Sequence, residues 1–341
     1  MLAEALATRR TESGLRPFDL RRDLAALADL MELAFASEPD VMRSSVVTEM
    51  RRVAKAGPAL WLLAASDSGR GSYMRGYVWT AGDRLVGNVT SSPDLAYRDL
   101  MVVSNVAVHP DFRRRGIAEQ LLQATLEDAA RRHVRGIVLE AQTENAAALE
   151  LYRKFGFEVY DTVSELSLAA PVRGGFRNAA LLSPRRSRHN DSLFSLLRET
   201  TPPTVQAVKP LRHRDYRLDI AIWFERFVDD VLYRRQSGDW VVEQGGSVSA
   251  LLQMTGQFAA EAHRLRLVVH PADRGRLEEP LLAHGLAWLN QFPSRSTWTV
   301  VSSSHPQALQ AFRQAGFQTL RVLDQMFVGL PRALRTQGDT R

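Results

Sequence analysis

The sequence predicts an α/β protein in which one fold occurs twice, each copy having a mixed central sheet flanked by helices. Three observations predict it. The chain has 341 residues, enough for about two domains at roughly 150 residues each. Two blocks of its first half recur in its second half. Helical and strand-like patterns alternate within both halves, which is typical of α/β domains.

The duplication is visible in two separate blocks. Residues 106–110 read VAVHP, and 161 positions later residues 267–271 read LVVHP. Residues 148–157 read ALELYRKFGF, and 160 positions later residues 308–317 read ALQAFRQAGF. Two matches at nearly one offset indicate an internal repeat.

The repeat also predicts the domain organisation. The expected segments are a first domain at 1–170, a linker at 171–205, a second domain at 206–332 and a C-terminal tail at 333–341. The linker combines a glycine pair, prolines and a basic run at 185–189, which suits an interdomain connection. A short helix is expected within it at 192–199.

The elements of the first copy follow from the spacing of apolar residues. Leu24, Leu27 and Met31 recur at helical spacing, whereas strands show apolar runs or alternation. Gly156 closes the last helix. The predicted order is helix 20–36, helix 46–56, strands 76–80 and 85–90, strand 100–108, helix 116–133, strand 136–141, helix 145–155 and strand 158–168.

The second copy repeats the end of this order. Its predicted elements are strand 266–269, helix 277–289, strand 297–302, helix 306–315 and strand 321–329.

Composition excludes several classes of chemistry. The chain has no cysteine, which excludes disulfides, thiolate metal sites and acyl-cysteine intermediates. No apolar run approaches the ~20 residues of a membrane span, and residues 1–10 lack the apolar core of a signal peptide. We therefore expect a cytoplasmic protein without membrane contact. Arginine supplies all but three of the 44 positive side chains. Either a coding bias or a need for phosphate-binding groups explains this preference for arginine over lysine.

The most informative segment reads RRRGIA at residues 113–118, between a predicted strand and a predicted helix. Free N–H groups and the positive end of the dipole at a helix N-terminus attract anions. Gly116 lets the backbone approach a ligand closely, Ala118 keeps the first turn small, and the three arginines add charge and donors. The segment therefore predicts a pyrophosphate site.

Other nucleotide and metal motifs are missing from the sequence. No GxxxxGK[ST] occurs, no GxGxxG follows a strand, and no HExxH is found. Phosphoryl transfer, dinucleotide binding and metalloprotease chemistry are therefore disfavoured, and we expect no metal.

Three elements in this order resemble the GNAT superfamily of N-acetyltransferases. The loop matches the (Q/R)-x-x-G-x-(G/A) motif, VAVHP precedes it, and Asn145, Ala148, Tyr152 and Gly156 follow at the family's spacing. The resemblance is dense from residue 83 to residue 160. It implies a tandem repeat of the GNAT fold (the acyl-CoA N-acyltransferase fold) and acetyl-CoA as the co-substrate.

The resemblance implies a role for each residue of the site. Backbone groups of Val106 and Val108 would pair with the pantetheine amides of acetyl-CoA, as an added β-strand does. The N–H groups from Arg114 through Glu119 would hold the pyrophosphate, Asn145 would contact the CoA arm, and the Tyr152 hydroxyl would protonate the departing thiolate. The implied CoA-binding set is Val106, Ala107, Val108, Arg113, Arg114, Arg115, Gly116, Ile117, Ala118, Glu119, Asn145, Ala148 and Tyr152.

The sequence does not single out one general base. Family members often place a glutamate in the strand before the loop, where this chain reads MVVSN at residues 101–105. Glu140 on the next strand is the catalytic candidate, with Glu32 and Asp99 as alternatives. The Ser-Asn pair that ends MVVSN could instead hold a water that relays the proton. Glu140 could equally be a hydrogen-bonded strand carboxylate without a catalytic role.

The second copy has lost these features. Its loop reads DRGRLEEP at residues 273–280, so Glu278 and Glu279 put carboxylates where phosphates would sit. Phe312 stands at the tyrosine position and His305 at the asparagine position. We expect this copy to keep the fold without the chemistry and to wall the acceptor site, hold the copies together or form a dimer contact.

The sequence therefore predicts an N-acetyltransferase that moves an acetyl group directly from acetyl-CoA to a primary amine. The acceptor would be a small molecule or a peptide, and a homodimer is compatible with the sequence. The alternative is a catalytically weak acyl-CoA sensor, because the strand carboxylate is missing. Nucleic-acid binding through residues 185–189 rests only on the basic run and the pI near 9.9, and we expect none.

Overall fold

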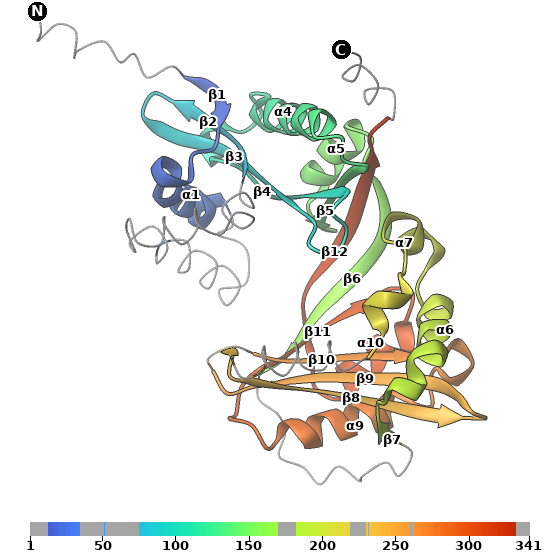
Figure 1. The fold of residues 1–341 in the computed structure, drawn as a ribbon. Helices are drawn as coiled ribbons and strands as arrows, with labels where there is room; N and C mark the ends of the chain where they lie inside the picture. Colours follow the sequence, from blue (N-terminus) through green and yellow to red (C-terminus); the bar gives the residue numbers. More distant parts are fainter. Residues whose placement is uncertain are drawn as a thin grey trace, which may run out of the picture. The chain divides into compact units, whose positions relative to one another are not determined.

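The computed structural model describes residues 13–34, 51, 75–169, 182–218, 230, 232–259 and 262–331 (Figure 1). Contacts divide the chain into two compact units, each of which contains part of a mixed β-sheet with helices on its faces. Unit 1 comprises residues 1–140, 147–158 and 326–341. Unit 2 comprises residues 141–146 and 159–325.

The strands of unit 1 form a mixed sheet. Its elements in chain order are β1 (Gly14–Pro17), α1 (Leu20–Ala34), β2 (Arg75–Ala81), β3 (Arg84–Pro93), β4 (Leu100–Val108), η1 (Pro110–Phe112), α4 (Ile117–Arg131), β5 (Gly136–Gln142) and α5 (Ala146–Lys154). Strands β1 to β4 pair antiparallel in sequence order, and β4 pairs parallel with β5. The end of β12 (Gln318–Gly329) lies next to β5.

Helices α1 and α4 cover opposite faces of this sheet. The leucines of α1 pack against Val78 and Ala107. Ile117 of α4 lies over Gly87 beside Trp79, so closely that a Cβ at residue 87 would meet it at 2.8 Å. Val78 and Trp79 are consecutive in a strand and therefore point to opposite faces. The end of β4 is joined to the start of α4 by the loop at residues 109–116, which contains η1.

Unit 2 continues the same layered plan. Its elements in chain order are β6 (Glu158–Leu168), β7 (Leu182–Pro184), η2 (Ser187–His189), α6 (Asn190–Thr200), α7 (Pro203–Val208), η3 (His213–Tyr216), β8 (Arg235–Gln244), β9 (Ser247–Gln257), β10 (His263–Val269), η4 (Pro271–Asp273), α9 (Glu278–Leu289), β11 (Thr297–Ser302), α10 (Pro306–Gln314) and β12. The strand order is β12-β6-β11-β10-β9-β8-β7.

The core of unit 2 lies between its sheet and the helices α9 and α10. Leu281, Leu286 and Phe312 from these helices pack with Leu252 and Leu267 of the sheet. On the other face, leucines of α6 pack with Val241, Leu251 and Val268 in a second cluster. The core has two parts because successive side chains along β9 and β10 point to opposite faces of the sheet.

Each unit contains a strand that the sequence repeat assigns to the other copy. β6 ends the first copy, yet in unit 2 it pairs antiparallel with β11 from Thr297↔Leu168 to Ser302↔Val163. β12 ends the second copy, yet its residues from Met326 onward belong to unit 1. The compact units are defined by contacts and the predicted domains by the repeat, so the boundaries near 170, 205 and 332 stay a prediction.

The structure confirms the predicted fold class and most predicted elements. The helix expected at 20–36 is α1, which is described as far as Ala34, and the helix expected at 46–56 lies, apart from residue 51, outside the described residues. The helix expected at 192–199 is α6. Strands β1, β7, β8 and β9 were not predicted. No helix in the described ranges combines the length and apolarity needed to span a bilayer.

Candidate active site

Strands β4 and β5 separate shortly after they begin to pair. Their parallel ladder joins Leu100 to Gly136, Met101 to Ile137 and Val102 to Val138, and it ends there. The predicted segment at residues 106–108 lies beyond this point, with its other edge paired to β3. The separation leaves one backbone edge of β4 open to an extended ligand, which could pair with it as an added strand.

A β-bulge redirects β4 just before this open edge. Asn105 has φ +54°, and the register between β3 and β4 shifts between Asn88 and Thr90. The fully buried Asn88 donates from Nδ2 to the Asn105 carbonyl oxygen at 2.9 Å and to Thr90 Oγ1 at 3.2 Å. These bonds fix the bulge, which re-aims the following residues. Asn88 was not among the predicted site residues, and its only signal in the sequence is that a polar residue stands inside an apolar strand.

The loop after β4 is braced by its own side chains. Arg113 donates from Nε to the Val108 carbonyl oxygen at 3.3 Å, and Arg115 donates from Nη2 to the Asp111 carbonyl oxygen at 2.8 Å. The Arg115 guanidinium also lies 4.9 Å from the Phe112 ring centroid. Two of the three predicted phosphate-binding arginines therefore hold the shape of the loop.

The loop leaves a series of backbone donors unpaired. Among the residues that the structure describes, no acceptor receives the N–H of any residue from Arg114 through Glu119. The first helical bond runs from Gln120 N to the Gly116 carbonyl oxygen at 3.1 Å. Arg114 at φ +59° and Gly116 at φ +73° turn the chain so that these donors precede α4. Such a set of donors at a helix N-terminus suits an anion with several oxygens.

Glycine at position 116 is required by conformation and not by crowding. A Cβ there would have only Gln120 Nε2 within 4 Å, at 3.9 Å, so space is available. Its φ of +73° lies in the left-handed region that side chains other than glycine's seldom adopt.

The equivalent loop of the second copy is filled by a carboxylate. The Gly275 N–H donates to Glu278 Oε2 at 2.8 Å, and Glu278 Oε1 bonds to His305 Nε2 at 2.8 Å. Burial alone raises the pKa of Glu278, but the bonds from His305 and from Gly275 hold that pKa below its ordinary value. The N–H groups of Arg276 and Leu277 also donate, both to the Asp273 carbonyl oxygen. This loop therefore supplies its own anion.

Tyr152 lies on α5 with its side chain buried. Its exposed fraction is 6%, and its ring packs against Phe157 at a centroid distance of 5.9 Å. Burial raises the pKa of Tyr152 to about 12, so its hydroxyl keeps its proton at neutral pH. Within the described ranges no group accepts that proton in a hydrogen bond. In the second copy, Phe312 packs against Phe317 in the same way.

The remaining predicted residues lie around the start of α5. Asn145 directly precedes this helix, and its N–H donates to the Gln142 carbonyl oxygen at 2.9 Å. Ala148 lies in the first turn. Glu119 pairs with Lys154 at 2.7 Å and so links the start of α4 to the end of α5. Lys154 is a residue that sequence reasoning missed, because only the packing of the two helices brings it to α4.

The candidate bases differ in their surroundings. Glu140 is exposed on β5, two residues after the pairing with β4 ends. The alternatives are engaged elsewhere, since Glu32 pairs with Arg51 and Asp99 pairs with Arg135 at 2.9 Å. Of the three carboxylates, Glu140 is the one that lies on the strand that separates from β4.

Comparison with known proteins finds one family that the first copy resembles. Residues 43–157 match the model of the Acetyltransferase (GNAT) family. The first copy is therefore similar to the GNAT family over these residues. A comparison with curated proteins gave no significant match.

Solved structures extend this similarity to the architecture of the whole chain. A tandem GNAT protein from the clavulanic acid biosynthesis pathway shares 19% identity over 93% of this chain and 98% of that chain, with a TM-score of 0.54. A GCN5-related N-acetyltransferase from Sphaerobacter thermophilus shares 16% identity over 92% and 95%, with a TM-score of 0.59. A putative acetyltransferase from Pyrococcus horikoshii shares 15% over 93% and 90%, with a TM-score of 0.51. The chain therefore has the fold of tandem GNAT proteins.

Proposed function

We propose that the first copy is an N-acetyltransferase that moves the acetyl group of acetyl-CoA directly to a primary amine. The observation that carries this proposal is the run of unpaired N–H groups from Arg114 through Glu119, next to the open edge of β4. The acceptor is a small-molecule or peptide amine.

The donors of the first copy fit the two parts of CoA that need protein partners. The unpaired N–H groups suit the pyrophosphate, whose oxygens need several donors at once. The open edge at residues 106–108 suits the pantetheine amides, which alternate donor and acceptor as a strand does. The remaining arginine of the loop, Arg114, adds positive charge, while Asn145 and Ala148 at the start of α5 are proposed to contact the CoA arm.

The proposed reaction is a single acyl transfer. The amine nitrogen attacks the thioester carbonyl carbon, a C–N bond forms, and the C–S bond breaks. The Tyr152 hydroxyl gives its proton to the departing thiolate, and the attacking nitrogen releases one proton to a base. The Tyr152 hydroxyl carries its proton at neutral pH, as a general acid must when the leaving group departs.

Glu140 is the proposed acceptor of the amine proton. It lies on the strand that diverges from β4, and its exposure keeps it accessible to water. A water held at the Ser-Asn pair of β4 would serve the same purpose, and Glu140→Gln separates the two arrangements. An unchanged rate in this variant assigns the proton transfer to water.

The test is release of CoA thiol from acetyl-CoA in the presence of a panel of primary amines, with the acetylated product identified by mass spectrometry. Turnover that depends on one class of amine is expected. Tight CoA binding without turnover by any amine would instead assign the protein to the sensor class.

A further inference from the structure

The cleft of the second copy remains open although its phosphate loop is filled. Strands β10 and β11 pair only at His263↔Thr297 and Arg264↔Trp298, and then they separate as β4 and β5 do. A cavity of about 460 Å³ lies in unit 2 at this separation. This volume is within the range of roughly 300–1,000 Å³ that is usual for small-molecule sites.

The end of the cleft that would take a pyrophosphate is closed by protein groups. Arg274 donates from Nε to the Val269 carbonyl oxygen at 3.4 Å and from Nη1 to the Ser304 carbonyl oxygen at 2.8 Å. Beside it, Glu278 Oε2 accepts a hydrogen bond from the Gly275 N–H. A CoA pyrophosphate would have to displace a buried carboxylate whose own bonds are already satisfied, so the cavity fits a shorter ligand than CoA.

Two arginines bring positive charge to the other part of the cavity. Arg264 and Arg266 are two residues apart on β10, point to the same face, and both line the cavity. Neither forms an ion pair with a carboxylate in the described part of the chain. Arg264 lies instead 5.5 Å from the Trp298 ring centroid.

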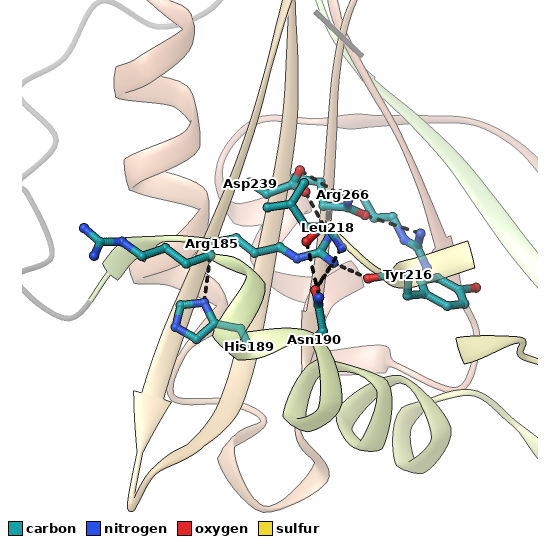
Figure 2. A network of polar contacts seen from close by, with 9 residues as sticks. Arg185, His189, Asn190, Tyr216, Leu218, Asp239 and Arg266 are labelled. Atoms are coloured by element: carbon teal, nitrogen blue, oxygen red, sulfur yellow. Dashed lines mark hydrogen bonds and ion pairs between the residues drawn. The ribbon is translucent and has the colours of Figure 1, made fainter. Parts of the chain in front are cut away.

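Arg266 contacts a partly buried polar network that does not neutralise its charge (Figure 2). Its Nη1 contacts Gln253 Oε1 at 3.5 Å, and Gln253 Nε2 donates to Asp239 Oδ1 at 3.3 Å. The carboxylate of Asp239 is itself paired with buried Arg185 at 3.2 Å. The negative charge of this network is therefore matched by Arg185, and the charge of Arg266 remains available to a ligand.

The walls of the cavity indicate what else the ligand carries. Thr299 is 1% exposed, lines the cavity, and its Oγ1 has no hydrogen-bond partner among the described residues. Beyond Arg264, no strand of the described residues pairs with the edge of β10 that faces β11, and residues 265–268 line the cavity. A buried unpaired hydroxyl and an open strand edge both favour a ligand with amide groups.

We propose that this cavity binds a small carboxylate that contains one or two amides, such as an N-acylated amino acid or dipeptide. Arg264 and Arg266 hold the carboxylate, and Thr299 with the open edge of β10 receives the amides. The site is separate from the acyl-CoA site of the first copy and does not depend on its activity.

The test is calorimetric titration of the full chain with N-acetyl-alanyl-alanine and N-acetylglutamate. At least one acid should bind saturably, and the C-terminal carboxamide of the same dipeptide should bind at least about tenfold more weakly. The double variant Arg264→Gln/Arg266→Gln should lose at least about tenfold in affinity for the acid, whereas Arg313→Gln, an exposed arginine of α10, should not. Saturating CoA should leave the binding unchanged.

Any of four results would overturn the proposal. Both acids could fail to bind, the carboxamide could bind as tightly as the acid, the double variant could bind the acid as tightly as the unchanged chain does, or CoA could displace the acid. Both arginines are exposed, so the double variant is expected to fold, and its circular dichroism spectrum checks this.

Discussion

At the scale of single residues, the first copy differs from the second at the positions that the proposed chemistry needs. Tyr152 and Phe312 occupy equivalent buried places, each packed against a following phenylalanine. Packing therefore explains an aromatic ring at both positions, whereas only the proposed proton transfer explains the hydroxyl of the first.

Tyr152→Phe is expected to lower kcat by roughly 10- to 1000-fold with little change in KM for acetyl-CoA. The change removes the proton donor and keeps the ring. Steady-state kinetics measure it, with Tyr77→Phe on β2 as the control. An unchanged kcat would refute the role of Tyr152 as general acid.

Gly116→Val is expected to raise the Kd for CoA at least about tenfold. A β-branched residue at φ +73° costs about 1–2 kcal/mol or moves the loop, and either effect disturbs the unpaired donors. Gly82→Val is the matched control, because Gly82 also has a positive φ and open space but lies in the turn between β2 and β3. Calorimetry should show a CoA defect in the first variant only; equal Kd values would reject the loop as the phosphate site.

His284 predicts a pH dependence of stability in unit 2. Burial lowers its pKa, and neither ring nitrogen has a partner within the described residues. As pH falls below the ordinary value of about 6.5, the unfolded chain takes up the proton before the folded chain does, so stability is lost. Urea unfolding at pH 7 and pH 5 should show this loss, and His284→Phe should reduce it. The same loss in the variant would assign the effect to other groups, such as His263, whose pKa burial also lowers.

At the scale of elements, both copies show the same strand separation followed by a loop and a helix. The difference lies in whether the loop's donors are free. In the first copy Glu119 turns to Lys154, whereas in the second Glu278 turns back to Gly275 and His305.

The filled loop predicts that CoA binds at one site per chain. Glu278 already occupies the donor at Gly275, and displacing a buried charge from its partners is costly. Calorimetric titration with CoA gives the stoichiometry, and the Gly116→Val variant should weaken the single binding transition. Two equivalent sites per chain would contradict this view of the second loop.

The basic run at 185–189 also acquires a meaning at this scale. Arg185 is buried in an ion pair with Asp239, and Arg188 pairs with Glu243 at 2.7 Å. Arg185 and Arg188 of the basic run are therefore paired with carboxylates of strand β8 within unit 2.

At the scale of the whole molecule, each compact unit needs residues from both copies. In unit 1, Gly136 of β5 approaches Phe327 so closely that a Cβ at residue 136 would lie 2.3 Å from the Phe327 ring. In unit 2, the β6 residue Glu165 pairs with Arg321 of β12 at 2.6 Å. Each compact unit is therefore completed by residues that the sequence repeat assigns to the other copy.

A fragment of residues 1–170 is expected to be unstable. It lacks the end of β12, which leaves the outer edge of β5 without a partner and exposes apolar surface. Thermal unfolding should show a lower midpoint than the full chain, or aggregation, together with weaker CoA binding. A soluble fragment that unfolds cooperatively and binds CoA as the full chain does would contradict the requirement of unit 1 for the end of β12.

Much of the candidate site could be predicted from the sequence because it is local. The RRRGIA loop, the helix that follows and the loss of the tyrosine at Phe312 are all encoded in short segments. Asn88, Lys154 and the arginine pair of β10 could not be predicted in their roles, because each acts on a group that is distant in sequence.

The sequence by itself determined the duplication, the α/β class, the position of the candidate anion loop and the absence of the tyrosine and the asparagine from the second copy. These features depend on short sequence patterns and on residue types, which can be recognised without the tertiary structure. Only the tertiary structure decided that the donors from Arg114 to Glu119 are unpaired, that β4 separates from β5, that the strands are exchanged and that a charged cavity remains in unit 2. Each of these depends on which backbone groups pair across long sequence separations, and such pairing leaves no short-range pattern.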